Sequence, residues 1–443
     1  MNRRVKTFAI LGAILVLAAS LRVFTFYLPH NHGDQIFYLG LAMKLEKFGL
    51  KGYNLQGIDV LSNEYFVAVT PSENSTKGNL LEGLEKENIF YYSQEPLSKM
   101  PPAFSYLLMM SHKIFSREKL FVAVDKNLGP DVVFVRPQIF LKTQFYAVWI
   151  SFAFSILFIY VTFLLGKLFF NEKVGLWASF LIAISPVDLL TSQRIWTDDM
   201  LAFFIALCVL LFWYGRIKNN ALFTFLSGVS VGIATITKGS GIFIMIIIVL
   251  FNILTLGKNS AAIRGTFRHV FIFIAASIAT AALWYYRVAM IYGTPFPLSG
   301  YQKDIEKVSA WFSMLNERSR FCHFYYFVCL TPFFIFFYIE AIQTILRKAV
   351  TKEKMFLLLW FLFFTIILVK IRAKEERYML PAYPAIAILS AVAIEDVRRT
   401  LRSVIANKFL CAMVIVCISL ACTAWSIYIG LRHVFNNAAI FNL

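Results

Sequence analysis

Long apolar segments recur along the chain, and they constrain its fold more than any other feature. The first, Thr7 to Leu28, holds about 22 residues with Arg22 as its one internal charge, enough to cross a hydrocarbon core about 30 Å thick. Because Arg22 lies near the end of the segment, we expect its side chain to snorkel to the membrane surface. Hydropathy predicts about eleven spans, near 7–28, 143–166, 174–190, 199–215, 221–237, 240–257, 269–289, 323–346, 354–371, 377–395 and 409–431.

The composition agrees with a multi-pass membrane protein. Of the 443 residues, 59% are hydrophobic and 15% are charged, far from the mixture found in soluble domains. The formal charge of +18 therefore does not indicate a nucleic-acid partner. The first apolar segment is too long for a cleavable signal peptide, so we expect it to stay as a helix. We predict an all-α polytopic protein in which residues 1–443 form one transmembrane domain, with no separate soluble domain.

Basic residues sort to one side of the membrane in this topology. If the N-terminus is cytoplasmic, every inner segment is positive, as the positive-inside rule requires. These inner residues are Lys167, Lys173, Arg216, Lys218, Lys258, Arg264, Arg268, Arg347, Lys348, Lys352, Lys354, Arg398, Arg399, Arg402 and Lys408. We expect a plasma-membrane protein, in particular of the bacterial inner membrane, with its C-terminus outside.

Two outer segments are long, roughly 29–142 and 291–320. In the first, Gln35 to Phe48 has helical spacing and ends at Gly49, and Pro102 to Phe115 is an amphipathic stretch that opens at a proline. We expect both to lie in the membrane interface as helices. Residues 50–98 are polar without sustained periodicity, and the sequence assigns them no fold.

Four polar clusters fall on the predicted outer face. They are Gly33-Asp34-Gln35, Lys99-Met100-Pro101-Pro102, Ser192 to Asp199, and Lys370 to Tyr378. The last places four cations on the side that the positive-inside rule leaves poor in them, which indicates an anionic ligand.

Lipid carriers present activated sugars at an outer membrane face, where nucleotide sugars are absent. A departing polyprenyl phosphate is a stabilised anion that needs no acid, so one carboxylate base and several cations suffice. We predict that Asp34 accepts the proton of an acceptor hydroxyl on a lipid, glycan or protein, which attacks the sugar with inversion. The predicted phosphate contacts are Lys99, Arg194, Lys374 and Arg377.

Each of these residues also has a simpler interpretation. Asp34 could cap the helix that follows it, Lys99 could snorkel, and Arg194 could be a solvated loop charge. The cations from Lys370 to Arg377 could form a hydrated loop or pair with the neighbouring Glu375 and Glu376.

A divalent metal is possible at His30, His32 and Asp34, because imidazole and carboxylate suit several such ions. The alternative is a pair of exposed loop histidines. Asp198 and Asp199 are adjacent on a predicted helix, so we expect at most one of them to face a site.

Several of these motifs resemble those of one class of membrane enzymes. Asp34-Gln-x-x-Tyr38-x-x-x-Ala42 resembles the Asp-Glu-x-x-Tyr-x-x-x-Ala motif of GT-C membrane glycosyltransferases, the class of protein O-mannosyltransferases and of the aminoarabinose transferase that modifies lipid A. Lys99-Met-Pro-Pro resembles their Lys-Pro-Pro element. Similar patterns follow in order, to about residue 395: Ser185-Pro186 to Asp198-x-x-x-Ala202-Phe203-Phe204, Gly228-x-x-x-Gly232 to Thr237-Lys238, Trp284-Tyr-Tyr-Arg287 to Pro295, and Glu376-Arg377-Tyr378-x-Leu-Pro381.

The resemblance implies a GT-C fold with about eleven transmembrane helices and a polyprenyl-phosphate sugar donor. It implies that Asp34 and Asp198 are catalytic and that Lys99 contacts the donor phosphate. The same motifs predict that Gln35, Tyr38 and Tyr378 line the substrate cavity. Gln35 replaces the usual Glu, which leaves a metal role open. Two rivals remain, a polysaccharide polymerase or ligase with a lipid-pyrophosphate donor, and a transporter or flippase.

Overall fold

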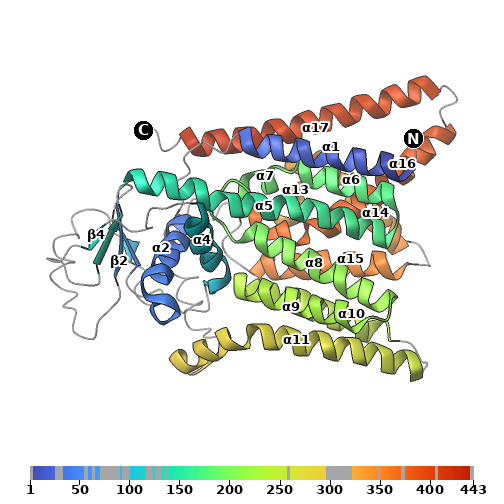
Figure 1. Ribbon diagram of the computed structural model, residues 1–443. Coiled ribbons are helices and arrows are strands. Elements are labelled where there is room, and N and C mark those ends of the chain that lie inside the picture. Colours follow the sequence, from blue (N-terminus) through green and yellow to red (C-terminus); the bar gives the residue numbers. More distant parts are fainter. Residues whose placement is uncertain are drawn as a thin grey trace.

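The computed structural model describes residues 3–24, 33–53, 58–61, 65–69, 90–91, 100–115, 123–124, 132–135, 137–256, 260–295, 322–346, 350–370, 375–404 and 408–439. Helices dominate and run side by side as a bundle, while a small sheet lies beyond one end (Figure 1). The bundle comprises α1 (Arg3–Phe24), α5 (Pro137–Phe169), α6 (Glu172–Ala183), α7 (Pro186–Thr191), α8 (Asp198–Ile217), α9 (Ala221–Thr237), α10 (Ile242–Leu254), α11 (Ser260–Tyr292), α13 (Cys322–Leu330), α14 (Ile335–Leu346), α15 (Lys352–Lys370), α16 (Tyr383–Val404) and α17 (Lys408–Ala439).

Each predicted span overlaps one of these helices or a broken pair of them. The prediction of a helical membrane protein is therefore confirmed. Among the described residues, five helices are long and apolar enough to cross a membrane: Val5–Phe24, Tyr146–Phe169, Asp198–Ile217, Ile263–Tyr292 and Glu376–Ser403. Shorter apolar helices add Ala221–Thr237, Gly239–Leu254, Pro332–Leu346 and Val416–Arg432. The number of crossings stays a prediction.

Prolines mark the places where helices are interrupted. Pro186 occupies the first turn of α7, directly after α6. Pro332 opens the 3-10 helix η5 (Pro332–Phe334) before α14, and Pro381 lies inside η6 (Glu376–Ala382) before α16. Because proline lacks an N–H group, it is accommodated at a helix start and disrupts a helix interior. The breaks at α7 and η6 supply most of the irregular backbone around the candidate site.

The centre of the bundle is α16. Its candidate span is 89% buried, and α6, α14 and α15 pack around it. Alanines at 385, 387 and 391 are all fully buried, so neighbouring backbones can approach closely. Helices in lipid associate through such close packing because the surrounding tails are as apolar as the helices.

Two glycines allow α9 to pack tightly against α11. A Cβ atom on Gly228 would lie 2.4 Å from the carbonyl oxygen of Phe273, and one on Gly232 would lie 2.5 Å from the Thr280 Cβ. The spacing of four is that of small residues at close helix crossings in membranes. The Gly228-x-x-x-Gly232 pattern therefore has a packing role in this chain.

The first outer loop contains two helices at the predicted places, α2 (Gly33–Phe48) and α4 (Pro102–Phe115). The 3-10 helix η1 (Gly49–Gly52) follows α2. Strands β1 (Ile58–Leu61), β2 (Tyr65–Val69), β3 (Phe90–Tyr91), β4 (Ala123–Val124) and β5 (Val132–Val135) form an antiparallel sheet of order β3-β1-β2-β5-β4. This sheet adds an element that the sequence did not predict. Whether α2 and α4 lie in the membrane interface stays a prediction.

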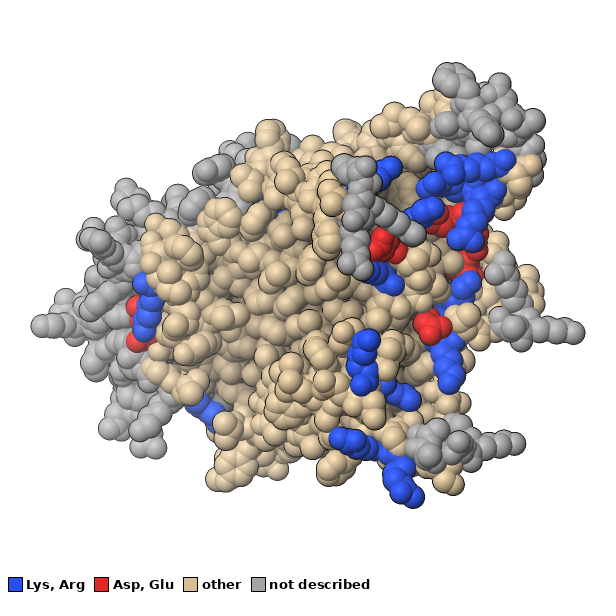
Figure 2. All heavy atoms as spheres, turned by 45° about the vertical axis from the view of Figure 1, so that its right-hand side comes forward, with Lys and Arg blue, Asp and Glu red and all other residues tan. Residues whose placement is uncertain are grey.

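Charged side chains gather at the end of the bundle away from the sheet, and a broad belt almost without charge separates the two ends (Figure 2). Helices α5, α8 and α16 each carry a basic residue in their last turn, Lys167, Arg216 and Arg402 respectively. Since α8 begins at Asp198, the candidate site and the basic end lie at opposite ends of this helix. The orientation in the membrane stays a prediction.

Candidate active site

Asp198 is the point where three elements meet. It begins α8 and is 1% exposed. The Lys238 ammonium, at the C-terminal end of α9, donates to Asp198 Oδ1 at 2.8 Å. From η6, Arg377 Nη1 approaches Asp198 Oδ2 at 3.7 Å. One buried carboxylate thus holds two cations that lie far apart in the sequence.

A tryptophan stacks with two of the site's cations. The guanidinium carbon of Arg377 lies 3.9 Å from the centroid of the Trp196 ring, and that of Arg194 lies 4.5 Å from it. The ring of Tyr378 is 4.8 Å from Lys238 Nζ and 5.4 Å from the Arg377 guanidinium carbon. Such contacts stabilise and orient buried cations. Aromatic rings therefore fix the direction in which these cations point.

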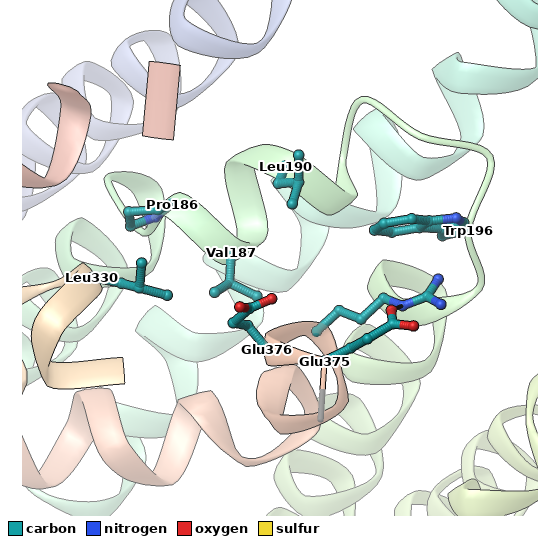
Figure 3. A pocket seen from close by; sticks show the side chains of 8 residues that line it. Pro186, Val187, Leu190, Trp196, Leu330, Glu375 and Glu376 are labelled. Carbon is teal, nitrogen blue, oxygen red and sulfur yellow. Dashed lines mark ion pairs between the residues drawn. The ribbon is translucent and has the colours of Figure 1, made fainter. Parts of the chain in front are cut away.

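A small pocket opens beside Arg377 (Figure 3). Its interior volume is about 40 Å³, room for a few water-sized groups. The lining contains four apolar residues and four charged or aromatic ones: Pro186, Val187, Leu190 and Leu330, and Trp196, Glu375, Glu376 and Arg377. The lining is thus amphipathic.

Helix α2 packs beside the turn that leads into α8. The Tyr38 hydroxyl lies 3.4 Å from Thr197 Oγ1, and the Tyr38 ring meets Phe104 of α4 edge to face at 5.3 Å. Gln35 is 1% exposed, and its Nε2 has no hydrogen-bond partner among the described residues. Asp34 belongs to the first turn of α2, one helical turn before Tyr38. The first outer loop therefore contributes to the same end of the bundle as Asp198.

Tyr53 fastens this loop to the bundle. Its hydroxyl donates to the carbonyl oxygens of Met100 at 3.0 Å and Pro101 at 3.3 Å, and burial raises the pKa of Tyr53, so the phenol stays a donor. Arg287 of α11 donates to the carbonyl oxygen of Tyr53 at 3.2 Å and to that of Leu50. The end of α2 and the start of α4 are thereby tied to one transmembrane helix.

Arg22 forms a buried ion pair, so the prediction that it snorkels is wrong. It is fully buried and pairs with Asp188 of α7. It also donates to Ser155 Oγ at 2.8 Å and to the carbonyl oxygens of Ala18 at 2.9 Å and Ala183 at 3.2 Å. A guanidinium with a buried carboxylate partner has no reason to reach the membrane surface.

Asp199, the next residue of α8, has a different partner from Asp198. The Thr191 hydroxyl donates to Asp199 Oδ1 at 2.9 Å, while Asp198 faces Lys238 and Arg377. The expectation that only one of the two aspartates faces the site agrees with this geometry. Both are nevertheless buried.

The structure brings together part of the predicted site. Arg194 and Arg377 contact Trp196, and Asp198 and Tyr378 contact Arg377. Tyr38 contacts the turn before α8, and Gln35 is buried in the same helix as Tyr38. Four predicted residues lie outside the described residues: His30, His32, Lys99 and Lys374. The side chain of Asp34 is likewise not described. Among the described residues, no group of three His, Cys, Asp or Glu side chains is arranged to hold a metal.

Two residues of the site were absent from the predicted set, Lys238 and Trp196. Lys238 ends the Thr237-Lys238 motif at the close of an apolar helix, a position that can hold a cation next to the outer face. Trp196 stands between Arg194 and Asp198 in the sequence, but nothing in the sequence shows that two cations lie against its ring.

A protein family model matches the part of the chain that holds much of the candidate site. The model of the family described as dolichyl-phosphate-mannose-protein mannosyltransferase matches residues 131–292, a segment that includes Arg194, Asp198 and Lys238. No curated protein matches the sequence of the chain.

Solved structures share the architecture. The apo oligosaccharyltransferase of Archaeoglobus fulgidus superposes with a TM-score of 0.58 at 13% identity, over 97% of this chain and 56% of that one. Apo ArnT of Cupriavidus metallidurans gives a TM-score of 0.54 at 14% identity, over 96% of this chain and 73% of that one. The fold is that of the GT-C membrane glycosyltransferases.

The resemblance seen in the sequence motifs is thereby confirmed at the level of the fold, together with the predicted class of integral membrane protein. The chain spans little more than half the length of the archaeal oligosaccharyltransferase. At these identities the two solved structures bear on the fold alone.

Proposed function

We propose that the chain transfers a sugar from a polyprenyl-phosphate carrier to an acceptor hydroxyl at the outer face of the membrane. The observation that carries the proposal is the meeting of three cations, Arg194, Lys238 and Arg377, around Trp196 and Asp198. Arginine forks and a lysine ammonium suit phosphate oxygens. They gather around Asp198 at the start of α8, whose other end carries the basic Arg216, so the positive-inside rule does not account for them.

The lining of the pocket beside Arg377 combines charged and apolar residues, as the binding of an amphipathic ligand requires. Trp196 lies at one end of the pocket and Leu330 at the other (Figure 3), and Arg377 also lines it. A lipid phosphate likewise combines a charged head with an apolar tail. Solved structures of the same fold include ArnT of Cupriavidus metallidurans bound to undecaprenyl phosphate and the archaeal enzyme with a dolichol-phosphate.

In the proposed reaction, Asp34 takes the proton of the acceptor hydroxyl while that oxygen attacks the anomeric carbon. The new glycosidic bond forms as the bond to the phosphate oxygen breaks on the opposite face of the sugar, so the configuration inverts. The phosphate leaves as an anion and needs no proton. Arg194, Lys238 and Arg377, together with Lys99 and Lys374, stabilise the growing negative charge.

The structure also bears on the part that Asp198 plays. Because Asp198 is buried and ion-paired with Lys238 and Arg377, its charge already serves to hold these cations. A base must present its oxygen to the acceptor hydroxyl within hydrogen-bond reach. We therefore assign the base to Asp34 and a positioning role to Asp198.

The test compares membranes with the wild-type protein against membranes with Asp34→Asn. Mass spectrometry of envelope glycolipids, glycans and proteins should show one sugar missing in the variant, with the unreacted carrier lipid accumulating. General-base catalysis contributes about 10²–10⁴-fold, so residual turnover should be at or below about 1%. The accumulating lipid also separates a monophosphate donor from a pyrophosphate donor.

Asp396→Asn is the matched control. It removes one carboxylate from α16, where Asp396 forms a partly exposed ion pair with Arg399 at 3.6 Å. This variant should keep wild-type turnover. Near-normal transfer by Asp34→Asn, with normal insertion and folding, would remove Asp34 as the base.

A further inference from the structure

Glu375, which lines the pocket, pairs with Arg377, the cation that contacts both Trp196 and Asp198. The Glu375 carboxylate forms an ion pair with Arg377 Nε. Both side chains line the pocket, and they are 16% and 7% exposed respectively. Asp198 approaches the same guanidinium from Nη1, at 3.7 Å. Glu375 is therefore the acid on the side of Arg377 that faces the pocket.

A phosphate group would need the edge of Arg377 that Glu375 occupies. A guanidinium binds phosphate best through two parallel N–H groups, and Nε belongs to one of the two edges that can do so. With Glu375 in contact with Nε, that edge is shared with a carboxylate. The carrier phosphate and Glu375 are thus rivals for one set of donors.

Glu375 can leave Arg377 without loss of local structure. It stands at the N-cap of η6, yet its side chain makes no capping hydrogen bond. Arg377 meanwhile keeps its stack with Trp196 at 3.9 Å and its approach to Asp198. The guanidinium would therefore stay in place when the carboxylate turns away.

The balance of charges near the pocket determines how strongly Glu375 competes with a bound phosphate. Among the described side chains, the cations Arg194, Lys238 and Arg377 are matched by Asp198, Glu375 and Glu376. A sugar-phosphate diester brings one negative charge, whereas the released monoester carries about 1.5 to 2 near neutral pH. Because the monoester product carries more negative charge, it is attracted most strongly by Arg377 and repelled most strongly by the Glu375 carboxylate.

We propose that Glu375 competes with the carrier phosphate for Arg377 and thereby limits how tightly the polyprenyl phosphate product is held. The carboxylate takes the guanidinium back as the product leaves, which favours release and a further round of transfer. This inference rests on the proposed function, because it requires the carrier phosphate to bind at Arg377.

The test measures binding of farnesyl phosphate to the full-length protein in lipid nanodiscs by titration calorimetry. Glu375→Gln keeps the size of the side chain and removes its charge. We expect its Kd for farnesyl phosphate to fall about tenfold, the effect of losing a close charge rival. The gain should be smaller for farnesyl methyl phosphate, which carries one charge, and farnesol should bind equally to both proteins.

Glu376→Gln is the comparison, since it removes the same charge from the next residue of the same pocket. A general effect of charge would tighten binding equally in both variants and would overturn the proposal, as would an unchanged or higher Kd in Glu375→Gln. Thermal unfolding of each variant serves as the folding check.

Arg377→Gln separates this inference from the proposed function. If Arg377→Gln binds farnesyl phosphate as well as the wild type does, the phosphate lies elsewhere and both proposals fail. If Arg377→Gln loses binding while Glu375→Gln does not tighten it, only the role of Glu375 fails.

Discussion

Replacement of Asp198 by Asn tests whether this carboxylate positions the cations of the site. Lys238 Nζ and Arg377 Nη1 lie 2.8 Å and 3.7 Å from its two oxygens. Without this carboxylate nothing offsets the repulsion between the two cations, which is about 2 kcal/mol for unit charges about 8 Å apart at an effective dielectric constant of about 20. Asn keeps the shape of Asp198 and an oxygen for Lys238, so the loss is one of charge.

The two cations therefore move apart, and bringing them back together around the phosphate costs about 2 kcal/mol, which corresponds to roughly thirtyfold in affinity. We therefore expect Asp198→Asn to raise the Kd for farnesyl phosphate by about this factor and to lower kcat/KM for the lipid donor to a similar extent. The dependence of the rate on pH should keep its shape, because the base, Asp34, is unchanged. Asp198→Asn should thus raise the Kd for farnesyl phosphate, whereas Glu375→Gln should lower it, although each variant removes one negative charge.

Initial rates over a series of donor concentrations and pH values, together with calorimetry, provide the measurement. Asp396→Asn, which removes a carboxylate from the other end of the bundle, controls for net charge. A loss of more than about a thousandfold in kcat, with a pH profile that loses its acidic limb, would show that Asp198 is itself the base. Unchanged binding and rates would show that the site does not depend on its charge.

The remaining predictions concern packing and stability. Arg22→Met leaves Asp188 buried without its cation, so the variant should lose about 3–5 kcal/mol of stability. The double variant Arg22→Met with Asp188→Leu should regain most of this stability. Thermal unfolding in detergent measures both variants, and equal midpoints for the single and double variants would contradict the buried pair. Gly228→Ala places a Cβ 2.4 Å from the Phe273 carbonyl oxygen and should cost about 1–3 kcal/mol; Gly265→Ala, which meets nothing within 4 Å, is the matched control and should unfold like the wild type.

The sequence by itself determined the helical elements of this protein. Long apolar runs predict spans because a helix in lipid must satisfy its backbone internally and present an apolar surface, and both conditions depend on local composition. The helices at Gly33–Phe48 and Pro102–Phe115 followed from spacing and from local start and stop signals. The motifs also predicted one site that includes Arg194, Asp198 and Arg377, and these residues lie together in the structure.

Only the tertiary structure decided how the charges pair. Lys238 meets Asp198 across 40 residues of sequence, and Arg22 meets Asp188 across 166. Such partners are chosen by the packing of whole helices, because a buried charge takes whichever opposite charge the fold brings within reach. The sequence placed Arg22 near the membrane surface because an isolated helix offers no partner, whereas α7 supplies one in the folded protein. The same reason explains why Trp196, with two cations close to its ring, could be recognised only from the assembled bundle.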